Sequence, residues 1–490
     1  AAVANALACT NLIVGKNASA DGSTIVSYSA DSYGLFGELY HYPAGMHKKG
    51  TLIDIHEWDT GKYLGQIAQA RQTYNVIGNM NEFQLTIGET TFGGRPELVD
   101  TTGIIDYGSL IYLGLQRSRT AREAIKVMTE LVQEYGYYSS GESFTIADPN
   151  EIWIMEMIGK GPGVRGAVWV AVRVPDDCIS AHANQSRIHQ FNMNDKENCM
   201  YSPDVISFAR EKGYFDGVNK DFSFADAYAP LDFGARRYCE ARVWSYFNMF
   251  TDRGNEFLPY ILGETNTPMP LFVKPNRKVS VQDVKNAMRD HYEGTPLDIS
   301  KDFGAGPYHT PYRLSPLSFK VGDREYFNER PISTQQSGFV FVAQMRSELP
   351  DPIGGVLWFG TDDANMTVFT PVYCCTDKVP VCYTRVDGAD YITFSWNSAF
   401  WIFNWVANMV YPRYDLMIDD VRATQTELET TFNEAQEGVE AAAAKLLEKD
   451  PAKAKAFLTN YTNMTAQSTF DTWKRLGEFL VVKYNDGVVK

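Results

Sequence analysis

Residues 9–26 have the sequence CTNLIVGKNASADGSTIV. Two apolar runs, residues 12–14 and 25–26, flank a polar segment that contains Asp21 and Gly22. An Asp-Gly pair between apolar runs is a strong local signal for a β-hairpin. The sequence therefore predicts that Cys9 stands at the start of the first strand of a hairpin.

The residues before Cys9 indicate a cleavage site. Ala6 and Ala8 are small, as residues before a processing site commonly are, so we expect cleavage of the Ala8-Cys9 bond. The cut would give Cys9 a free α-amino group, whose ordinary pKa is about 7.7–8.0. One residue would then hold both a thiol nucleophile and a base. Residues 1–8 are expected to be a propeptide or a signal-peptide remnant.

Two other interpretations of Cys9 stay open. A buried structural thiol is the commonest fate of a cysteine. A lipid-anchored surface-binding protein would also carry a cysteine after a cut, but Ala6 stands where such a motif usually has Leu. In addition, the apolar residues 12–14 follow where a polar tether is expected. We favour the catalytic interpretation because a strand and hairpin follow at once.

The composition of the 490-residue chain excludes several classes of function. Its net charge is −15 and the acidic residues are spread along the chain, which disfavours a nucleic-acid partner. No stretch reaches the roughly 18 consecutive apolar residues of a membrane span. The nearest approach, residues 400–410, is interrupted by Asn404 and Asn408 and is expected to be a core helix.

The cysteines and histidines show no metal-binding spacing. The seven Cys form no C-x-x-C pair and the seven His no H-E-x-x-H motif, so neither a metal nor another cofactor is expected. Six cysteines besides Cys9 would suffice for disulfides in an oxidising compartment. The Ala-rich start weakly favours export to the periplasm or the exterior, and a cytoplasmic location stays open.

The pattern along the chain predicts an α/β (α+β) fold with layered antiparallel sheets covered by helices. A catalytic domain is expected over residues 9–394, followed by a helical C-terminal segment, 395–490, packed on its core. Strands are predicted at 143–147, 151–156, 168–172, 338–345, 356–360 and 366–370. Helices are predicted at 120–135, at 281–292 with Ser280 as N-cap, at 400–410 and at 421–448.

Polar side chains near the predicted strand ends are candidates for the chemistry of Cys9. Asp31 follows the second strand of the hairpin, where its carboxylate could hold the Cys9 amine. Asn81 lies in a polar corner and could donate to an oxyanion, and Asn184 could supply a second donor or bind substrate. A turn residue is the alternative for Asp31 and for Asn81. His182 is more simply explained as structural.

A cluster of arginines is unusual in so acidic a chain. Arg236, Arg237 and Arg242 fall on the first turns of one predicted helix. An inward guanidinium would lower the pKa of a thiol and attract a substrate carboxylate. The alternative is a solvated helix face on which Glu240 and Asp232 pair with these arginines.

In this order, these clusters resemble the N-terminal-cysteine dipeptidases of the dipeptidase A type, a family of N-terminal nucleophile hydrolases. Secernins, bile-salt (choloylglycine) hydrolases and penicillin V acylases are more distant relatives. Residues 9–16 and 21–26 resemble the opening signature of the family, and the resemblance extends to about residue 375. The family's conserved Asp, Asn-Glu corner, later Asn and helical Arg match Asp31, Asn81-Glu82, Asn184 and Arg242.

The resemblance implies a four-layer αββα sandwich and hydrolysis of dipeptides or short peptides through a thioester on Cys9. Removal of residues 1–8, by autocatalysis or by a protease, would activate the enzyme. An N-acyl amide hydrolase on the same scaffold is the alternative activity, and a homo-oligomer stays open. The resemblance implies the catalytic residues Cys9, Asp31, Asn81, Asn184 and Arg242 and the substrate-binding residues Tyr28, Glu82, Arg236 and Arg237.

Tyr28 departs from the pattern of the family. The relatives usually carry Arg or Lys three positions before the conserved Asp, and here that position is Tyr28. Either another arginine supplies the missing charge, or the activity or substrate preference differs.

Overall fold

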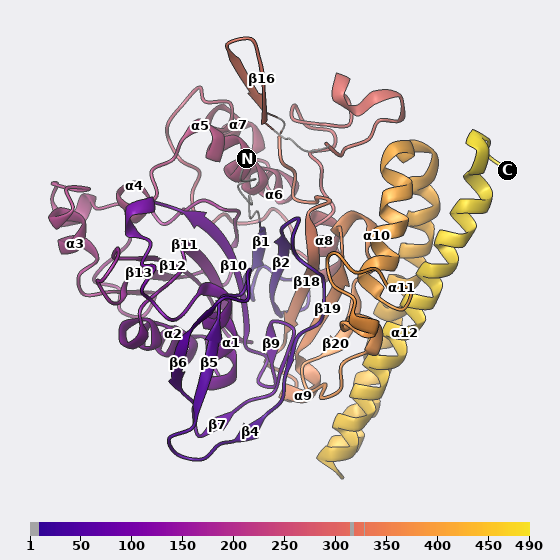
Figure 1. Cartoon of the computed structure of the whole chain (residues 1–490), viewed down its shortest axis with the longest axis horizontal. Helices are drawn as coiled ribbons and strands as arrows, with labels where there is room; N and C mark the ends of the chain where they lie inside the picture. The colour runs from indigo at the N-terminus through magenta and orange to yellow at the C-terminus, as the bar shows by residue number, and fades with distance from the viewer. Residues whose placement is uncertain (1–8, 314–317, 328) are drawn as a thin grey trace.

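The computed structural model describes residues 9–313, 318–327 and 329–490, which form mixed antiparallel sheets and helices (Figure 1). The six-stranded sheet has the order β14 (Ile179–His182), β1 (Asn11–Val14), β2 (Thr24–Asp31), β18 (Ser337–Met345), β19 (Val356–Thr361), β20 (Thr370–Tyr373). The eight-stranded sheet has the order β15 (Cys199–Tyr201), β13 (Ala167–Arg173), β12 (Ile152–Gly159), β11 (Gly141–Ala147), β10 (Thr86–Gly93), β9 (Met80–Asn81), β8 (Val76–Ile77), β3 (His41–Tyr42).

Smaller elements complete the described part of the chain. The two-stranded ribbons are β4 (Gly45–Met46) with β7 (Gln72–Thr73), β5 (Leu52–His56) with β6 (Tyr63–Ala68), and β16 (Ser318–Val321) with β17 (Arg324–Phe327). The helices are α1 (Tyr107–Arg117), α2 (Ala121–Tyr135), α3 (Val205–Glu211), α4 (Phe224–Tyr228), α5 (Phe233–Ala235), α6 (Ala241–Phe250), α7 (Gly254–Ile261), α8 (Val281–Ala287), α9 (Asp351–Gly354), α10 (Ala399–Val410), α11 (Tyr414–Leu447) and α12 (Pro451–Tyr484).

The predicted hairpins are confirmed. Strands β1 and β2 pair antiparallel with Ile13 opposite Val26, and β11 and β12 form the second hairpin. At the first turn, Gly22 adopts the left-handed φ of 78° that a residue with a side chain rarely takes. The Asp21 carboxylate accepts hydrogen bonds from Ser19 and Ser23 beside it.

Several predicted elements have different bounds; the helix predicted at 421–448, for example, begins at Tyr414 as α11. Helix α8 begins after Ser280, which caps it as predicted, but ends five residues earlier than expected. The predicted strand at 366–370 is wrong except at its last residue, because Asp363 caps a short 3₁₀ turn there and the backbone N–H of Phe369 donates to Glu429. Regular pairing begins only with β20. Helix α2, with Thr120 as its N-cap, has the predicted bounds.

The two large sheets face each other at β1, β2 and β10. His182 of β14 bonds Thr90 and Thr145 of the other sheet, each at 2.7 Å, which confirms its structural role. Asn11 donates to the backbone oxygen of Glu89 at 2.7 Å. A Cβ at Gly88 would lie 2.5 Å from the Asn11 side chain, so glycine is needed for the sheets to approach here.

Helices cover the outer sides of both sheets. Helices α1 and α2 contact strands of the eight-stranded sheet, while α8, α10 and α12 contact strands of the six-stranded sheet. The long helices α11 and α12 run side by side at the C-terminal side of the molecule (Figure 1). No helix among the described residues is long and apolar enough to cross a membrane.

A buried ion pair fastens α11 to the body. Glu429 of α11 accepts two hydrogen bonds from Arg289, which follows α8, and both side chains are almost fully buried. The Arg289 guanidinium holds the pKa of Glu429 below its ordinary value despite burial. Removal of one partner would leave a buried, uncompensated charge.

We therefore expect Glu429→Gln to lower the free energy of unfolding by about 3–5 kcal/mol. The exposed pair Arg253–Glu256 provides the matched control, because an exposed ion pair contributes at most about 1 kcal/mol. Urea denaturation followed by tryptophan fluorescence measures both variants. Equal losses in Glu429→Gln and Glu256→Gln would contradict a structural role for the buried pair.

Candidate active site

Cys9 lies two residues before β1, which stands between β14 and β2 in the six-stranded sheet, and its side chain is 3% exposed. An isolated bridge pairs Thr10 with Ser29 of β2, so the hairpin continues to this end of the sheet. Antiparallel pairing therefore brings Asp31, the last residue of β2, beside Cys9. The predicted association of Cys9 with Asp31 follows from local hairpin geometry.

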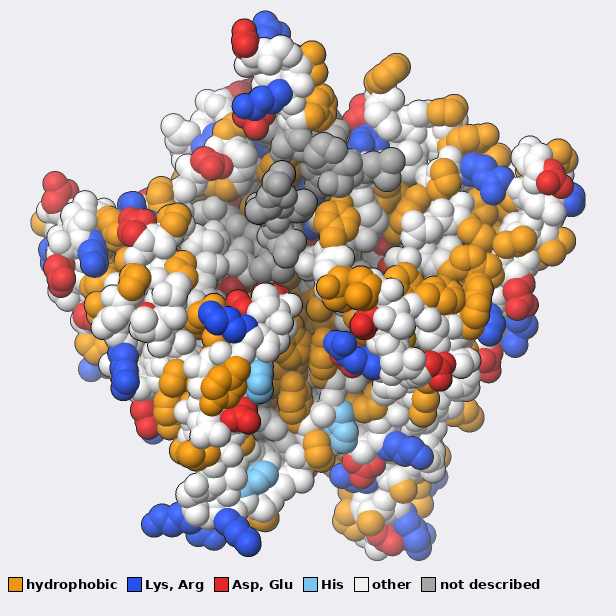
Figure 2. Space-filling model, viewed as in Figure 1, with side chains coloured by type: hydrophobic (Ala, Val, Ile, Leu, Met, Phe, Trp, Pro, Cys, Tyr) orange, Lys and Arg blue, Asp and Glu red, His pale blue; other side chains and the backbone are white. Residues whose placement is uncertain are grey.

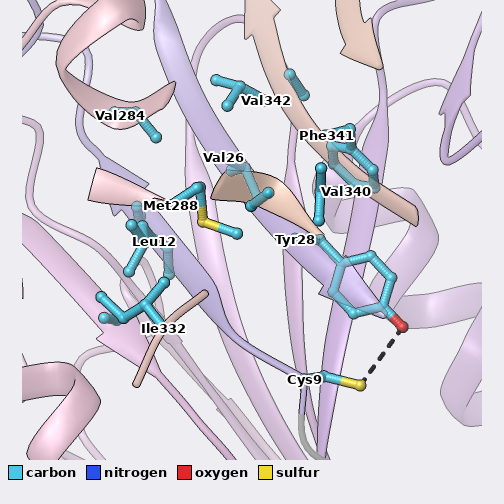
Figure 3. Close-up of a cluster of buried hydrophobic side chains, with 14 of the residues drawn as sticks. Cys9, Leu12, Val26, Tyr28, Val284, Met288, Ile332, Val340, Phe341 and Val342 are labelled. Carbon is cyan, nitrogen blue, oxygen red and sulfur yellow. Dashed lines mark hydrogen bonds between the residues drawn. The ribbon is translucent and has the colours of Figure 1, made fainter. Parts of the chain in front are cut away.

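Tyr28 connects Cys9 to a buried carboxylate. The Cys9 Sγ lies 3.8 Å from the Tyr28 hydroxyl, and the two side chains point toward each other (Figure 3). That hydroxyl donates to Glu89 Oε1 at 2.6 Å, so the thiol is the donor toward Tyr28. The nucleophile is therefore one hydroxyl away from the Glu89 carboxylate.

These neighbours disfavour the thiolate. Burial raises the pKa of the Cys9 thiol well above its ordinary value, and the charges of Glu89 and Asp31 raise it further. The hydrogen bonds of Cys9 with the Asp31 backbone and with Tyr28 lower this pKa. Because the thiolate is the reactive form, Cys9 in this arrangement needs a base or an added positive charge beside it.

Arg242 of α6 binds the backbone at Cys9 and is itself 1% exposed. Its Nη1 donates to the Cys9 carbonyl oxygen and to Thr10 Oγ1, both at 2.8 Å. Its Nη2 donates to the Ala183 oxygen at 3.2 Å and to Asn184 Oδ1 at 3.0 Å. One guanidinium thus brings together Cys9 and Asn184, two of the predicted site residues.

A further arginine lies beside Asp31. Burial raises the pKa of Asp31 to about 6, although Arg330, Ser337 and Arg242 favour its ionised form. Burial and the repulsion of Arg242 lower the pKa of Arg330 to about 10, while Asp31 and Cys9 raise it, so Arg330 is a cation at neutral pH. Arg330 therefore supplies positive charge close to Cys9, where Tyr28 carries none.

Asn81 and Glu82 do not join this cluster. Both amide hydrogens of Asn81 are donated to carbonyl oxygens at the end of α1, Leu115 and Ser118, each at 2.8 Å. The predicted oxyanion role of Asn81 gains no support from these contacts, because its side-chain amide has no free N–H. Glu82 accepts from the backbone of Asn75 in the same corner.

The other two predicted arginines are engaged elsewhere. Both lie in a π-helical turn, Arg236–Glu240, that directly precedes α6 with Arg242. Arg236 donates to Thr265 and Asn266, whereas Arg237 pairs with Glu329, the neighbour of Arg330. Among the described residues, neither arginine forms a hydrogen bond with Cys9, so these contacts give no support to their predicted binding roles. Glu240, predicted as their partner, instead pairs with Arg187 at 3.0 Å.

Sequence reasoning missed Glu89 and Arg330. The available signal for Glu89 was its position inside an otherwise apolar and Thr-rich strand, because a glutamate is rarely buried unless it is paired. Arg330 precedes β18 in a segment without regular structure, and nothing in its local sequence connects it to Cys9, 321 positions earlier in the numbering.

A pocket of about 440 Å³ opens next to Asp31, lined by Ser32 and by aromatic side chains. These aromatic side chains are Phe36, Tyr40, Trp58 and Tyr391. Figure 2 shows the face of the molecule hollowed along its middle, with hydrophobic side chains in the hollow. No group of three or more potential metal ligands occurs in the part of the chain that the structure describes. All seven cysteines are described, and none forms a disulfide.

Comparisons with known proteins identify the family. The model of peptidase family C69 matches residues 8–41 and 36–427, which is most of the chain. The chain belongs to peptidase family C69. This C69 peptidase is 30% identical over 395 residues to a probable dipeptidase of Salmonella dublin, covering 75% of the chain and 81% of that relative.

More relatives cover similar shares of this C69 peptidase. A probable dipeptidase of Latilactobacillus sakei is 26% identical, with 83% of the chain and 82% of the relative aligned. Dipeptidase A of Lactobacillus helveticus is 24% identical, with 80% of each chain aligned.

The geometry predicts how the Cys9 thiol responds to Glu89→Gln in the 490-residue chain. Loss of the carboxylate removes the largest electrostatic contribution that raises the Cys9 pKa. We expect alkylation of Cys9 by iodoacetamide at pH 8 to become several-fold faster, on the scale of 10-fold per pKa unit. Peptide mass spectrometry measures the labelling of Cys9 separately from that of the other cysteines. Exposed Glu130→Gln is the matched control, and an unchanged Cys9 rate in Glu89→Gln would refute the coupling.

Proposed function

We propose that this C69 peptidase is a cysteine dipeptidase that acts through a thioester on Cys9 after removal of residues 1–8. The observation that carries the proposal is the convergence of Asp31, Arg242 and Asn184 on Cys9. Several relatives are named dipeptidases and align over most of their length. Residues 1–8 lie outside the described residues, so cleavage at Ala8-Cys9 is part of the proposal.

In the first half of the proposed reaction, the neutral α-amine of Cys9 accepts the Sγ proton. The thiolate attacks the carbonyl carbon of the peptide bond, and the resulting ammonium gives its proton to the leaving amine as the C–N bond breaks. The second residue of the dipeptide leaves, and the first stays as a thioester on Cys9. In the second half, the amine takes a proton from water, the hydroxide attacks the thioester, and the acid is released with the thiol restored.

Asp31 and Arg330 are suited to support these proton transfers. The Asp31 carboxylate stabilises an ammonium at Cys9, and the ammonium in turn offsets the two carboxylates that raise the thiol pKa. Arg330 adds a second positive charge near the thiolate. The α-amine thus provides the base that the thiol requires and, once protonated, a positive charge beside Cys9.

Asn184 is the better candidate for the oxyanion donor. Arg242 binds its Oδ1, and one amide hydrogen goes to the Thr91 backbone oxygen at 2.8 Å. An amide has two N–H donors, so the second is available for a developing negative charge. The left-handed backbone of Asn184, with φ of 60°, fixes this orientation.

The finer fold prediction belongs to the same proposal. We infer that helices α1 and α2, the two facing sheets, and α8, α10 and α12 are the four layers of an N-terminal nucleophile hydrolase. The contacts between the sheets and the helices on their outer sides support this arrangement. The 3% exposure of Cys9 counts against a lipid anchor at this residue.

The first test compares the 490-residue chain with a version that begins at Cys9. Only the shorter protein has the free amine, so we expect it alone to hydrolyse Ala-Ala, with a difference on the order of 10³-fold or more. Mass spectrometry should detect an acyl adduct on Cys9 after rapid acid quenching. Cys9→Ala of the shorter protein is the control without a nucleophile, and equal activity of the two lengths would contradict the mechanism.

A second test separates the two asparagines in the protein that begins at Cys9. Asn184→Gly keeps the left-handed backbone and should lower kcat about 10²–10³-fold, the usual effect of losing an oxyanion donor. Asn81→Ala should lower the free energy of unfolding but change kcat much less, because Asn81 bonds only its own corner and α1. A larger kcat loss in Asn81→Ala than in Asn184→Gly would return the oxyanion role to Asn81.

A further inference from the structure

A second pocket, of about 260 Å³, lies on the other side of Asp59 from the aromatic pocket. We refer to it as the acidic pocket; its lining includes Glu57, Asp59, Thr91, Tyr107, Ser139 and Glu142. Tyr107 donates to Asp59 at 2.9 Å, and Thr91 donates to Glu142 at 2.6 Å. Its wall therefore presents carboxylates and hydroxyls.

The inner end of the acidic pocket leads to the nucleophile. In the antiparallel pairing of β10 with β11, Thr91 is opposite Glu142 and Glu89 is opposite Phe144, so Glu89 and Glu142 are diagonal neighbours on one face. Both carboxyls are 1% exposed. Glu89 in turn accepts the hydroxyl hydrogen of Tyr28, which contacts Cys9.

Within the described part of the chain, no cationic side chain pairs with these acids. Among the described residues, no Lys, Arg or His forms an ion pair with Glu57, Asp59, Glu89 or Glu142. One oxygen of Glu142 and one of Glu89, both Oε2, are buried and accept no hydrogen bond from any other described side chain or backbone group. Buried carboxylates are normally paired, so this set lacks the cation that its chemistry calls for.

Without a paired cation, the charged forms of the two buried carboxyls are disfavoured. Burial and the neighbouring Glu89 raise the pKa of Glu142 well above its ordinary value, and burial raises that of Glu89 as well. A larger pocket of about 640 Å³ beside α8 and α11 differs in this respect, because its Arg277 pairs with Asp283 and its Arg289 with Glu429.

We propose that the carboxyl pair Glu89–Glu142, with Asp59 at the rim, binds the free α-ammonium group of the substrate. The inference rests on the proposed function, because it places the scissile carbonyl at Cys9. In a dipeptide the α-nitrogen is two bonds from that carbonyl carbon, so the ammonium must lie close to the nucleophile. The uncompensated carboxyl pair is one hydroxyl away from Cys9 Sγ.

The assignment separates dipeptides from N-acyl amides as substrates. An ammonium supplies the missing cation and donates hydrogen bonds to the free carboxylate oxygens. An acylated nitrogen is neutral, and it would leave the buried negative charge unpaired. The acidic pocket therefore selects peptides with an unblocked N-terminus.

The experiment uses the protein that begins at Cys9 and compares Ala-Ala with N-acetyl-Ala-Ala. We expect kcat/KM to favour the free peptide by about 10²-fold or more. In Glu142→Gln this ratio should fall about 10–100-fold, mainly through a higher KM for Ala-Ala, with little change for the acetylated peptide. Exposed Glu130→Gln is the matched control and should keep the wild-type ratio.

A second variant tests the inference even if Glu142→Gln does not fold. Asp59 is exposed, so Asp59→Asn should fold normally and lower the ratio in the same direction by a smaller factor. Equal hydrolysis of the free and acetylated peptides by the wild type would overturn this inference and leave the dipeptidase proposal standing. Failure to hydrolyse either peptide would overturn both. If Glu142→Gln changed only the rate on Lys-Ala, the pocket would bind a side chain and the α-ammonium assignment would be wrong.

Discussion

The arrangement around Cys9 depends on one buried cation, the guanidinium of Arg242. It donates to Cys9, Thr10, Ala183, Asn184 and its own helix at Tyr238. A guanidinium without these acceptors could not stay in the interior, and the buried carbonyl oxygens would lose their donors without it. The hydrogen bonds of this one guanidinium thus hold together three segments that are far apart in the sequence.

The charges around the nucleophile form two groups. Arg330 interacts with Arg242, Asp31 and Cys9, whereas Glu89 accepts the Tyr28 hydroxyl hydrogen and has Glu142 as its diagonal neighbour. Tyr28 is neutral because burial and the nearby acids raise its pKa well above the ordinary value. It contacts Cys9 and Glu89 by hydrogen bonds and packs edge-on against Phe339 and Phe341. An arginine at position 28 would instead place a cation between the thiol and the carboxyl groups.

The parts of the site that could be predicted from the sequence are those that local structure brings together. Cys9 and Asp31 belong to one hairpin, so the turn at Gly22 suffices to place them side by side. Arg330 and Glu89 reach the site through contacts between distant segments, which no local pattern encodes. Asn81 and Asn184 look alike in the sequence, since each sits in a polar corner after a strand. They differ in hydrogen bonding: the amide hydrogens of Asn81 stabilise its own corner, whereas those of Asn184 are only partly used.

Asp31 gives the proposed maturation an energetic direction. Before cleavage the nitrogen of Cys9 is a neutral amide, and burial raises the pKa of the Asp31 carboxyl to about 6, so burial opposes its charge. Hydrolysis of the Ala8-Cys9 bond would create an ammonium at that point, and the burial cost of Asp31 would then be offset by an ion pair. On this mechanism the precursor is the electrostatically frustrated form of the protein. Processing would relieve the frustration as well as expose the amine, so the mature site would be more rigid than the one from which it is made.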